Sequence, residues 1–405
     1  MAQAQTFFVT CAPGIEPTLH AEMRALRFGR VERQVGGVRF EGSLTDAWRA
    51  NLWLRTAVRV LMRVSRFEAR DADQLHRGAS AIEWSRFLRS DGTFVVDAQS
   101  SESALDHTLF VEQRVKDAVV DQFRTASGAR PSVSKDSPDL AIHVHLFKDR
   151  CTISADTSGE SLHKRGWRKF QGRAPLAETL AAALVLESGW DRRSPLVDPF
   201  CGSGTILIEA ALVAANVAPG LFRERFGFER WPGHDELAWQ RFRERVRAQA
   251  STPAVVESFA PARSPSSSRA PKSATTAMPI LRGFDANADT IAGAMENVRS
   301  AGFGDVIELA VQHAGDFAPK RGWNAWIVAN PPYGERVGEE RDLVPLYERF
   351  GRTLRERCAG YHVALLSGNP KLTRALGLAP ERRLAWKNGA IDCECLVFDL
   401  AAPSS

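Results

Sequence analysis

The sequence lacks any run of apolar residues long enough to cross a membrane, since none reaches the ~20 residues that a bilayer requires. Its first nine residues contain neither a basic segment nor a long apolar stretch, so they do not form a secretory signal. We therefore expect a cytoplasmic protein that does not associate with membranes.

Cysteine is scarce, with six residues in a chain of 405. Only Cys393 and Cys395 are close together, and their alternate spacing places both on one face of a strand, as in an ordinary core. A structural zinc site needs two pairs of Cys or His at ligand spacing, whereas His143 and His145 are a lone alternating pair. We expect no metal and no disulfide.

The remaining composition is that of a globular protein, with 44% hydrophobic and 25% charged residues. A length of 405 residues exceeds one ordinary core and indicates two or three domains. The net charge of +5 is compatible with a polyanionic partner but does not identify one. The oligomeric state stays open.

The first part of the chain, to about residue 157, mixes short strands and helices in an α+β pattern. Period-2 and period-3.6 apolar spacings alternate irregularly here. Strands are predicted at 7–10, 37–40, 59–67 and 93–98, helices at 44–53 and 107–123, and a hairpin at 140–147 and 151–155.

The second part, from about residue 162 to 402, alternates strand and helix regularly. This alternation predicts an α/β fold with a mostly parallel sheet. A terminal antiparallel hairpin is expected to turn at Asn388-Gly389. Residues 251–278 interrupt the pattern and are rich in Ser, Pro and Ala, so we predict a mobile surface insertion there.

A glycine-containing loop joins a predicted buried strand to a helix; its candidate binding residues are Asp198, Phe200, Gly202, Gly204 and Thr205. Glycines at such a junction let the backbone turn sharply and let a ligand lie against main-chain amides. No Gly-Lys-Ser/Thr follows, which argues against a phosphate-binding P-loop, and the dinucleotide fingerprint lacks its third glycine. The aspartate before the loop would repel a phosphate and would suit the ammonium of an amino-acid moiety.

Two further aspartates follow successive predicted strands. Asp285 is placed like the acidic residue that holds ribose hydroxyls in doubly wound folds. Asp316 is positioned to accept a hydrogen bond from an adenine amino group. Each alone is as well explained by a helix cap, but their recurrence at strand ends of one sheet favours ligand binding.

The segment Asn330, Pro331, Pro332 and Tyr333 follows the strand 323–329. The lone pair of an amino group on an aromatic ring is delocalised, so this amine is a poor nucleophile. The side-chain oxygen of Asn330 and the carbonyl of Pro331 can hold both amino hydrogens and direct the lone pair at a methyl donor. Tyr333 can stack on an extruded base. This pattern predicts the catalytic site of an amino methyltransferase.

The motifs 198–210 and 330–336 resemble those of Rossmann-like class I methyltransferases that use S-adenosyl-L-methionine. More narrowly, the chain resembles THUMP-containing bacterial guanine-N2 methyltransferases of large-subunit ribosomal RNA, through segments 162–168, 174–184, 218–222 and 228–233. The resemblance covers nearly the whole chain. Bifunctional members carry a second methyltransferase domain that this sequence does not include.

The resemblance implies three parts: a ferredoxin-like part at 1–43, a THUMP RNA-binding domain at 44–156 and a methyltransferase domain at 157–405. It implies ribosomal RNA as the partner, with transfer RNA as an alternative. Asp198, Gly202 and Gly204 would line the cofactor site, Asp285 would meet the ribose and Asp316 the adenine. A basic cluster at 164–173 is either a solvated linker or a contact to the RNA backbone.

Other activities remain open. The four-residue site suits adenine N6 as well as guanine N2, and glutamine-amide methylation of a protein is a further option. The THUMP-like first part favours RNA over DNA and protein. A different class, an RNA-binding module with an inactive methyltransferase fold, requires a damaged site, whereas every expected position carries a competent residue.

Overall fold

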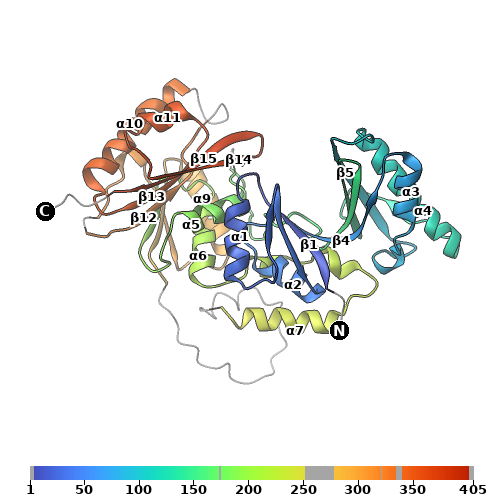
Figure 1. Ribbon diagram of the computed structural model, residues 1–405. Helices are drawn as coiled ribbons and strands as arrows, with labels where there is room; N and C mark the ends of the chain where they lie inside the picture. Colours follow the sequence, from blue (N-terminus) through green and yellow to red (C-terminus); the bar gives the residue numbers. More distant parts are fainter. Residues whose placement is uncertain (1–3, 173–174, 251–277, 321, 334–339, 401–405) are drawn as a thin grey trace, which may run out of the picture. The chain divides into compact units, whose positions relative to one another are not determined.

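The structure is a computed structural model that describes residues 4–172, 175–250, 278–320, 322–333 and 340–400 (Figure 1). The predicted insertion 251–278 lies outside the described residues except for Met278. The chain forms two compact units: the first comprises 1–11, 19–162 and 223–242, and the second comprises 12–18, 163–222 and 243–405.

The first unit contains an eight-stranded sheet of order β2-β3-β1-β4-β8-β7-β5-β6. Its strands are β1 Gln5–Thr10, β2 Glu32–Gln34, β3 Gly37–Gly42, β4 Arg59–Glu68, β5 Thr93–Ser101, β6 Ser132–Val133, β7 Leu140–Phe147 and β8 Arg150–Asp156. Pairing is antiparallel except where β5 meets β6 and β7. The strands therefore run continuously from the ferredoxin-like part into the THUMP-like part.

Four helices belong to this sheet: α1 Glu16–Ala25, α2 Leu44–Trp53, α3 Ala72–Ser80 and α4 Thr108–Ser127. Ser43 and Asp46 form a capping box that starts α2, and the Asp71 side chain caps α3. Gly128 ends α4 in the left-handed conformation. The α3 helix was not predicted, since its apolar stripe is reduced to Leu75 and Ala79. Short 3-10 turns lie at Trp84–Arg86 and Gly227–Arg230.

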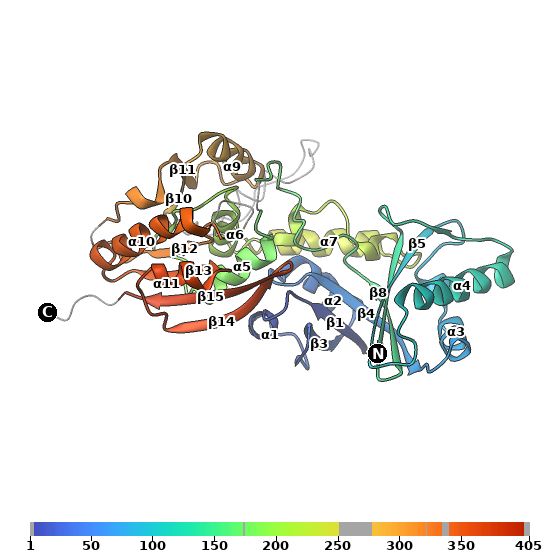
Figure 2. The same cartoon turned by 90° about the horizontal axis from the view of Figure 1, so that it is seen from above.

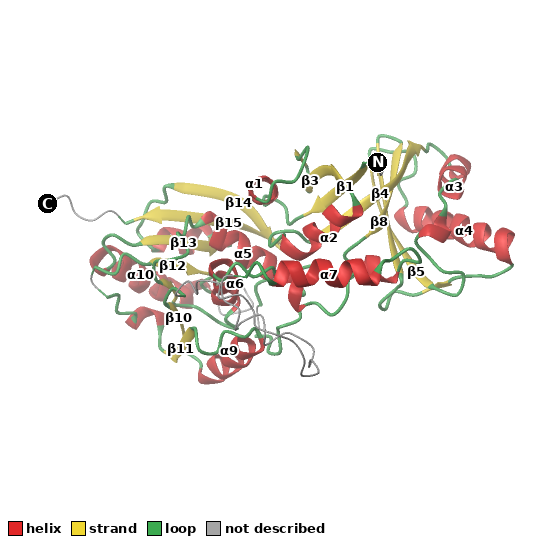
Figure 3. Cartoon of the chain, turned by 90° about the horizontal axis from the view of Figure 1, so that it is seen from below, coloured by secondary structure: helices red, strands yellow, loops and turns green. Residues whose placement is uncertain are grey.

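One face of the eight-stranded sheet forms the core of this unit. Alternate side chains such as Phe7, Met62, Ile142 and Ile153 are almost fully buried, as period-2 patterning requires. Helices α3 and α4 lie together on one side of β4 and β8 (Figures 2 and 3). The buried side chains of the sheet point toward these helices, and the other face of the sheet is more exposed.

The second unit contains a seven-stranded sheet of order β11-β10-β9-β12-β13-β15-β14. Its strands are β9 Leu196–Asp198, β10 Leu281–Asp285, β11 Ile307–Val311, β12 Trp326–Ala329, β13 His362–Ser367, β14 Arg382–Asn388 and β15 Ile391–Asp399. The first five in spatial order are parallel, and β15 pairs antiparallel with β13 and β14. Figure 2 shows β13, β15 and β14 in succession. The predicted α/β sheet with its terminal hairpin is confirmed.

The helices of this unit are α5 Glu178–Glu187, α6 Thr205–Ala214, α9 Ala288–Ser300, α10 Glu340–Arg357 and α11 Pro370–Ala375, and α7 Glu236–Arg247 begins in the first unit. Short 3-10 turns lie at Pro219–Phe222 and Ala314–Asp316. Every residue of α6 from Thr205 to Val213 is buried, as expected of a helix that packs against both strands and neighbouring helices. Among the described residues, no helix is both long and apolar enough to traverse a bilayer.

Candidate active site

The loop after β9 carries its two glycines in the left-handed conformation, Gly202 at φ +51° and Gly204 at φ +80°. A Cβ at either position would find room, so backbone conformation rather than space selects glycine here. Gly204 is the residue that precedes α6. The loop therefore turns sharply from strand to helix and leads directly into the helix N-terminus.

Asp198 ends β9 and is fully buried. Its Oδ1 accepts a hydrogen bond of 3.0 Å from the Phe200 amide, whereas its Oδ2 has no partner among the described residues. Burial raises the pKa of Asp198 to about 8, and the nearby Asp285 carboxylate contributes to this rise. A buried carboxyl with one unpartnered oxygen fits a ligand that brings a positive charge.

Asp285 ends β10, the strand next to β9. The parallel pairing puts Gly283 opposite Asp198, so both strands deliver their aspartates to the same edge of the sheet. A Cβ at Gly283 would lie 2.5 Å from a Leu207 methyl and 2.9 Å from the Cβ of Cys201, so a side chain at this position would force its neighbours to shift. The Oδ1 of Asp285 accepts from the Asn287 amide at 2.9 Å, and this bond orients the carboxylate.

Asn330 follows β12, which lies on the other side of β9. Its Oδ1 is buried and has no hydrogen-bond partner in the described part of the chain. The Pro332 carbonyl accepts a hydrogen bond of 3.1 Å from the Tyr347 hydroxyl, which anchors the turn to α10. Within the described residues the carbonyl of Pro331 has no donor, so adjacent residues of the chain offer two available oxygen acceptors.

Tyr333 is held at its hydroxyl and along one edge of its ring. Its hydroxyl accepts from Asn388 Nδ2 at 3.2 Å and lies 3.6 Å from the Cys393 thiol. The ring edge packs so closely on Gly368 that a Cβ there would lie 2.6 Å from it. Tyr333 is 9% exposed, and burial raises its pKa. The terminal hairpin thus sets the orientation of this ring, which the sequence motif could not indicate.

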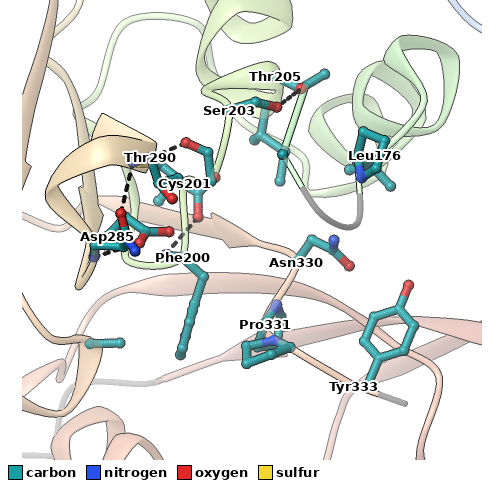
Figure 4. A pocket seen from close by; sticks show the side chains of 18 of the residues that line it. Leu176, Phe200, Cys201, Ser203, Thr205, Asp285, Thr290, Asn330, Pro331 and Tyr333 are labelled. Atoms are coloured by element: carbon teal, nitrogen blue, oxygen red, sulfur yellow. Dashed lines mark hydrogen bonds between the residues drawn. The ribbon is translucent and has the colours of Figure 1, made fainter. Parts of the chain in front are cut away.

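These residues line one pocket of about 870 Å³ in the second unit. Figure 4 shows Cys201, Ser203 and Thr205 on one side and Asn330, Pro331 and Tyr333 on the other. The predicted residues that line it are Asp198, Phe200, Gly202, Thr205, Asp285, Asn330, Pro331, Pro332 and Tyr333. Segments more than 130 residues apart therefore meet at the carboxyl ends of β9, β10 and β12, where ligands bind in open α/β sheets.

Gly204 and Asp316 do not line this pocket. Gly204 serves the turn, as described. The Asp316 carboxylate accepts a hydrogen bond from the Arg349 guanidinium of α10, and its side chain is 57% exposed. His313 and Ala314, just before it, line the pocket instead. The contacts of Asp316 therefore do not support the predicted bond to an adenine amino group.

Arg168 is a structural partner of the cofactor loop that sequence reasoning missed. It donates to Glu178 Oε1 at 2.8 Å, and at 3.0 Å each to Ser203 Oγ, Thr205 Oγ1 and the Leu176 carbonyl. Arg165 is 2% exposed and pairs with Glu209 at 3.2 Å. These two arginines of the predicted basic cluster point inward and bond to groups of the protein itself, and Arg173 lies outside the described residues.

Asn297 of α9 is a second missed residue. Its Oδ1 accepts from the amides of Lys169 at 2.7 Å and Phe170 at 2.8 Å. Its Nδ2 donates to the carbonyls of Phe170 at 2.9 Å and Ser203 at 3.0 Å. This fully buried amide ties the segment before α5 to the cofactor loop. No sequence signal distinguished it from an ordinary polar helix residue.

Among the described residues, one group has metal-ligand geometry: Glu229, His234 and Glu236 in the first unit. His234 Nε2 lies 3.1 Å from Glu236 Oε2. All six cysteines are buried, and none of them forms a disulfide.

Three family models match the chain. They are described as "RMKL-like, methyltransferase domain" at residues 165–396, "THUMP domain" at 69–156 and "RlmL ferredoxin-like domain" at 6–61. The ferredoxin-like and THUMP matches are separated by only part of β4, consistent with the sheet that both share.

Curated relatives include "Ribosomal RNA large subunit methyltransferase K/L" of Methylococcus capsulatus, 39% identical over 99% of this chain and 52% of the relative. The protein of the same name from Pseudomonas paraeruginosa is 37% identical over 99% of this chain and 53% of the length of that relative. The chain thus spans about half the length of these relatives.

Solved structures are similar over the whole chain. SMU.472, a putative methyltransferase complexed with SAH, has a TM-score of 0.84 at 29% identity, with 100% of both chains covered. A possible methylase from Clostridium difficile 630 has a TM-score of 0.85 at 29% identity and the same coverage. The predicted class I methyltransferase fold with its ferredoxin-like and THUMP parts is confirmed, and the chain belongs to the RMKL-like methyltransferase family.

Proposed function

We propose that this chain is an S-adenosyl-L-methionine-dependent methyltransferase that forms N2-methylguanosine in large-subunit ribosomal RNA. The observation that carries the proposal is the pairing, in one pocket, of two features. These are the Oδ2 of buried Asp198 and the acceptors of Asn330 and Pro331, none of which has a hydrogen-bond partner among the described residues. The first fits the cofactor's ammonium, and the second fits the two hydrogens of an aromatic amine.

The residues fit the cofactor along the strand ends. Asp198 would hold the ammonium, Asp285 the ribose hydroxyls, and the Gly202 turn would let the ligand approach the main chain. The cofactor supplies the methyl group when bound. Relatives named as ribosomal RNA methyltransferases and the structure complexed with SAH support this assignment.

The chain's own residues then act on the base. Asn330 Oδ1 and the Pro331 carbonyl accept the two amino hydrogens, which makes the nitrogen pyramidal and turns its lone pair toward the donor. Tyr333, held by Asn388, provides a fixed aromatic surface beside the base. Positioning supplies much of the rate acceleration, so no strong base is needed.

The RNA substrate rests on the THUMP match and on the names of the relatives. A ribosomal RNA substrate in turn implies a cytoplasmic location. We also propose that the THUMP domain begins at residue 44 and the methyltransferase domain at residue 157.

Transfer of labelled methyl from S-adenosylmethionine to ribosomal RNA, transfer RNA and DNA, followed by nucleoside analysis, tests the proposal. Label in N2-methylguanosine of large-subunit RNA is the expected outcome. Label in N6-methyladenosine, or only in transfer RNA, would mean that the same site acts on a different substrate from the one proposed. No transfer to any of them would favour the inactive RNA-binding module.

A further inference from the structure

The exposed face of the eight-stranded sheet carries polar and aromatic side chains in rows. The strand register sets these rows. In one row Arg63 lies opposite Ser154, which lies opposite His143. In the next row Arg66 lies opposite Thr152, which lies opposite His145. At the next step Glu68 faces Arg150, which faces Phe147. Directly opposed side chains lie about 5 Å apart, so these rows form one continuous surface. We call it the open face.

The open face is hollowed. Residues from β1, β2, β3, β4, β5, β7 and β8 line a cavity of about 870 Å³ within the first unit. Its lining includes five arginines and one acidic residue: Arg39, Arg59, Arg63, Arg66, Arg150 and Asp97. The hollow is therefore strongly basic, which the chain's net charge of +5 did not reveal.

The acidic groups beside the open face already have partners. Glu32 and Glu41 pair with Arg39, both at 2.8 Å, and Asp97 lies 3.4 Å from His143. Asp156 is buried and pairs with Arg59 and His143. Glu68 lies 3.8 Å from Arg70.

Three arginines are left without an acidic partner among the described residues: Arg63, Arg66 and Arg150. Arg63 donates to the Thr6 hydroxyl at 2.8 Å, and Arg66 and Arg150 are exposed. The pKa of Arg63 is lowered, first by burial and then by the charges of Arg39 and Arg66. Repulsion among like charges is relieved when a polyanion binds between them.

Aromatic rings stand within the same surface. Phe147 is 43% exposed next to Arg150, His145 is exposed beside Arg66, and Phe8 of β1 also lines the hollow. Sheet faces that combine such rings with arginines bind single-stranded nucleic acid, because unpaired bases stack on the rings while phosphates meet the cations. A duplex keeps its bases stacked internally and cannot use these rings.

We propose that the open face binds a single-stranded segment of RNA. Its phosphates contact Arg63, Arg66 and Arg150, and its bases stack on Phe147 and His145. This inference rests on the proposed function for the identity of the nucleic acid as RNA, and it adds the surface and the strandedness.

The test measures binding of the full chain to a fluorescently labelled 12-nucleotide RNA of mixed sequence, single-stranded and as a duplex. Single-stranded RNA should bind more tightly. R63A/R66A/R150A should weaken that binding at least tenfold and lower the slope of log K against log salt by about 2, since each lost phosphate contact contributes about 0.7. The control R24A/R77A/R124A removes three exposed helical arginines and should leave affinity within twofold.

Two further variants guard against misfolding. R66A/R150A alters only exposed side chains and should still lose affinity, and F147A should weaken single-stranded binding about fivefold while F147W retains it. Equal losses in the control triple variant, or tighter binding of the duplex, would overturn the proposal. Binding is measured without methyl transfer, so the two proposals can fail separately. If the protein methylates no ribosomal RNA but R66A/R150A still weakens RNA binding, the proposed function is wrong and the inference about the open face stands.

Discussion

The two sheets of this protein expose their functional groups in different places. In the seven-stranded sheet the central strands β9, β12 and β13 are largely buried, and polar groups gather where β9, β10 and β12 end. In the eight-stranded sheet one face packs on helices, and polar groups spread over the other face. A sheet buried on both faces can offer a ligand only its ends, whereas a half-covered sheet offers a surface. The first arrangement suits a small cofactor and one base, and the second suits a polymer.

The largest effect is expected at Asn330, because the strand-end site depends on single atoms. Asn330→Ala removes one of two acceptors and should lower the methyl-transfer rate about 10³-fold, as loss of a preorganised hydrogen-bonding group does. Cofactor affinity, measured by calorimetry, should stay within threefold. The matched control Asn369→Ala alters a helix cap of α11 and should leave the rate nearly unchanged. Full activity of Asn330→Ala would exclude the assigned role.

The next effect concerns the framework of the same site. Asn297→Ala leaves the amides of Lys169 and Phe170 without their acceptor and should lower the free energy of unfolding by about 3 kcal/mol. Urea denaturation measures this change. Asn287→Ala, which removes only an exposed cap of α9, should cost about 1 kcal/mol. Equal losses in the two variants would show that the buried network is not special.

Cofactor binding should depend on Asp198 and on pH. The pKa of about 8 means that the carboxyl is protonated near neutrality and must lose its proton to meet an ammonium. Affinity for S-adenosylhomocysteine should therefore rise as pH increases from 6 to 8, up to about tenfold per unit, with a proton released on binding. Calorimetry in buffers of different ionisation enthalpy detects this release. Asp198→Asn should bind about 30-fold more weakly and lose the pH dependence.

The stability consequences of pH separate the two sheets further. Asp198 has a folded pKa above its unfolded value, so this acid lowers stability as pH rises from about 4 to 8. On the open face, hydrogen bonds to Asp156 and Asp97 outweigh burial and raise the pKa of His143 to about 9. Stabilisation by protonated His143 is full below about pH 6.5 and is lost as pH rises through 9. NMR titration of the His143 ring checks the value, and Asp97→Asn should lower it.

The smallest effect is expected at the Tyr333 hydroxyl. Tyr333→Phe loses the contacts to Asn388 and Cys393 but keeps the ring against Gly368, so we expect a two- to threefold higher KM for RNA. Tyr333→Ala should raise KM by tenfold or more. If the two variants behaved alike, the hydroxyl and not the ring would be the important group.

The sequence by itself determined the local chemistry of this protein. The Asn330-to-Tyr333 segment, the Asp198 loop and the strand-helix alternation each have physical requirements that few residues satisfy, such as the positive φ at Gly202. These requirements act over a few residues and can therefore be read in order along the chain. The α/β fold and its terminal hairpin followed from the same local patterns.

Only the tertiary structure decided which polar residues face one another. Arg168 and Asn297 hold the cofactor loop through contacts across 35 and 94 residues, and Asp316 turns to Arg349. The rows of the open face exist because a bulge in β4 lets Arg63 and Arg66 face the same side across three residues. An arginine beside an aspartate and an arginine without one look alike in a sequence. Their difference arises from register and burial, which long-range packing sets.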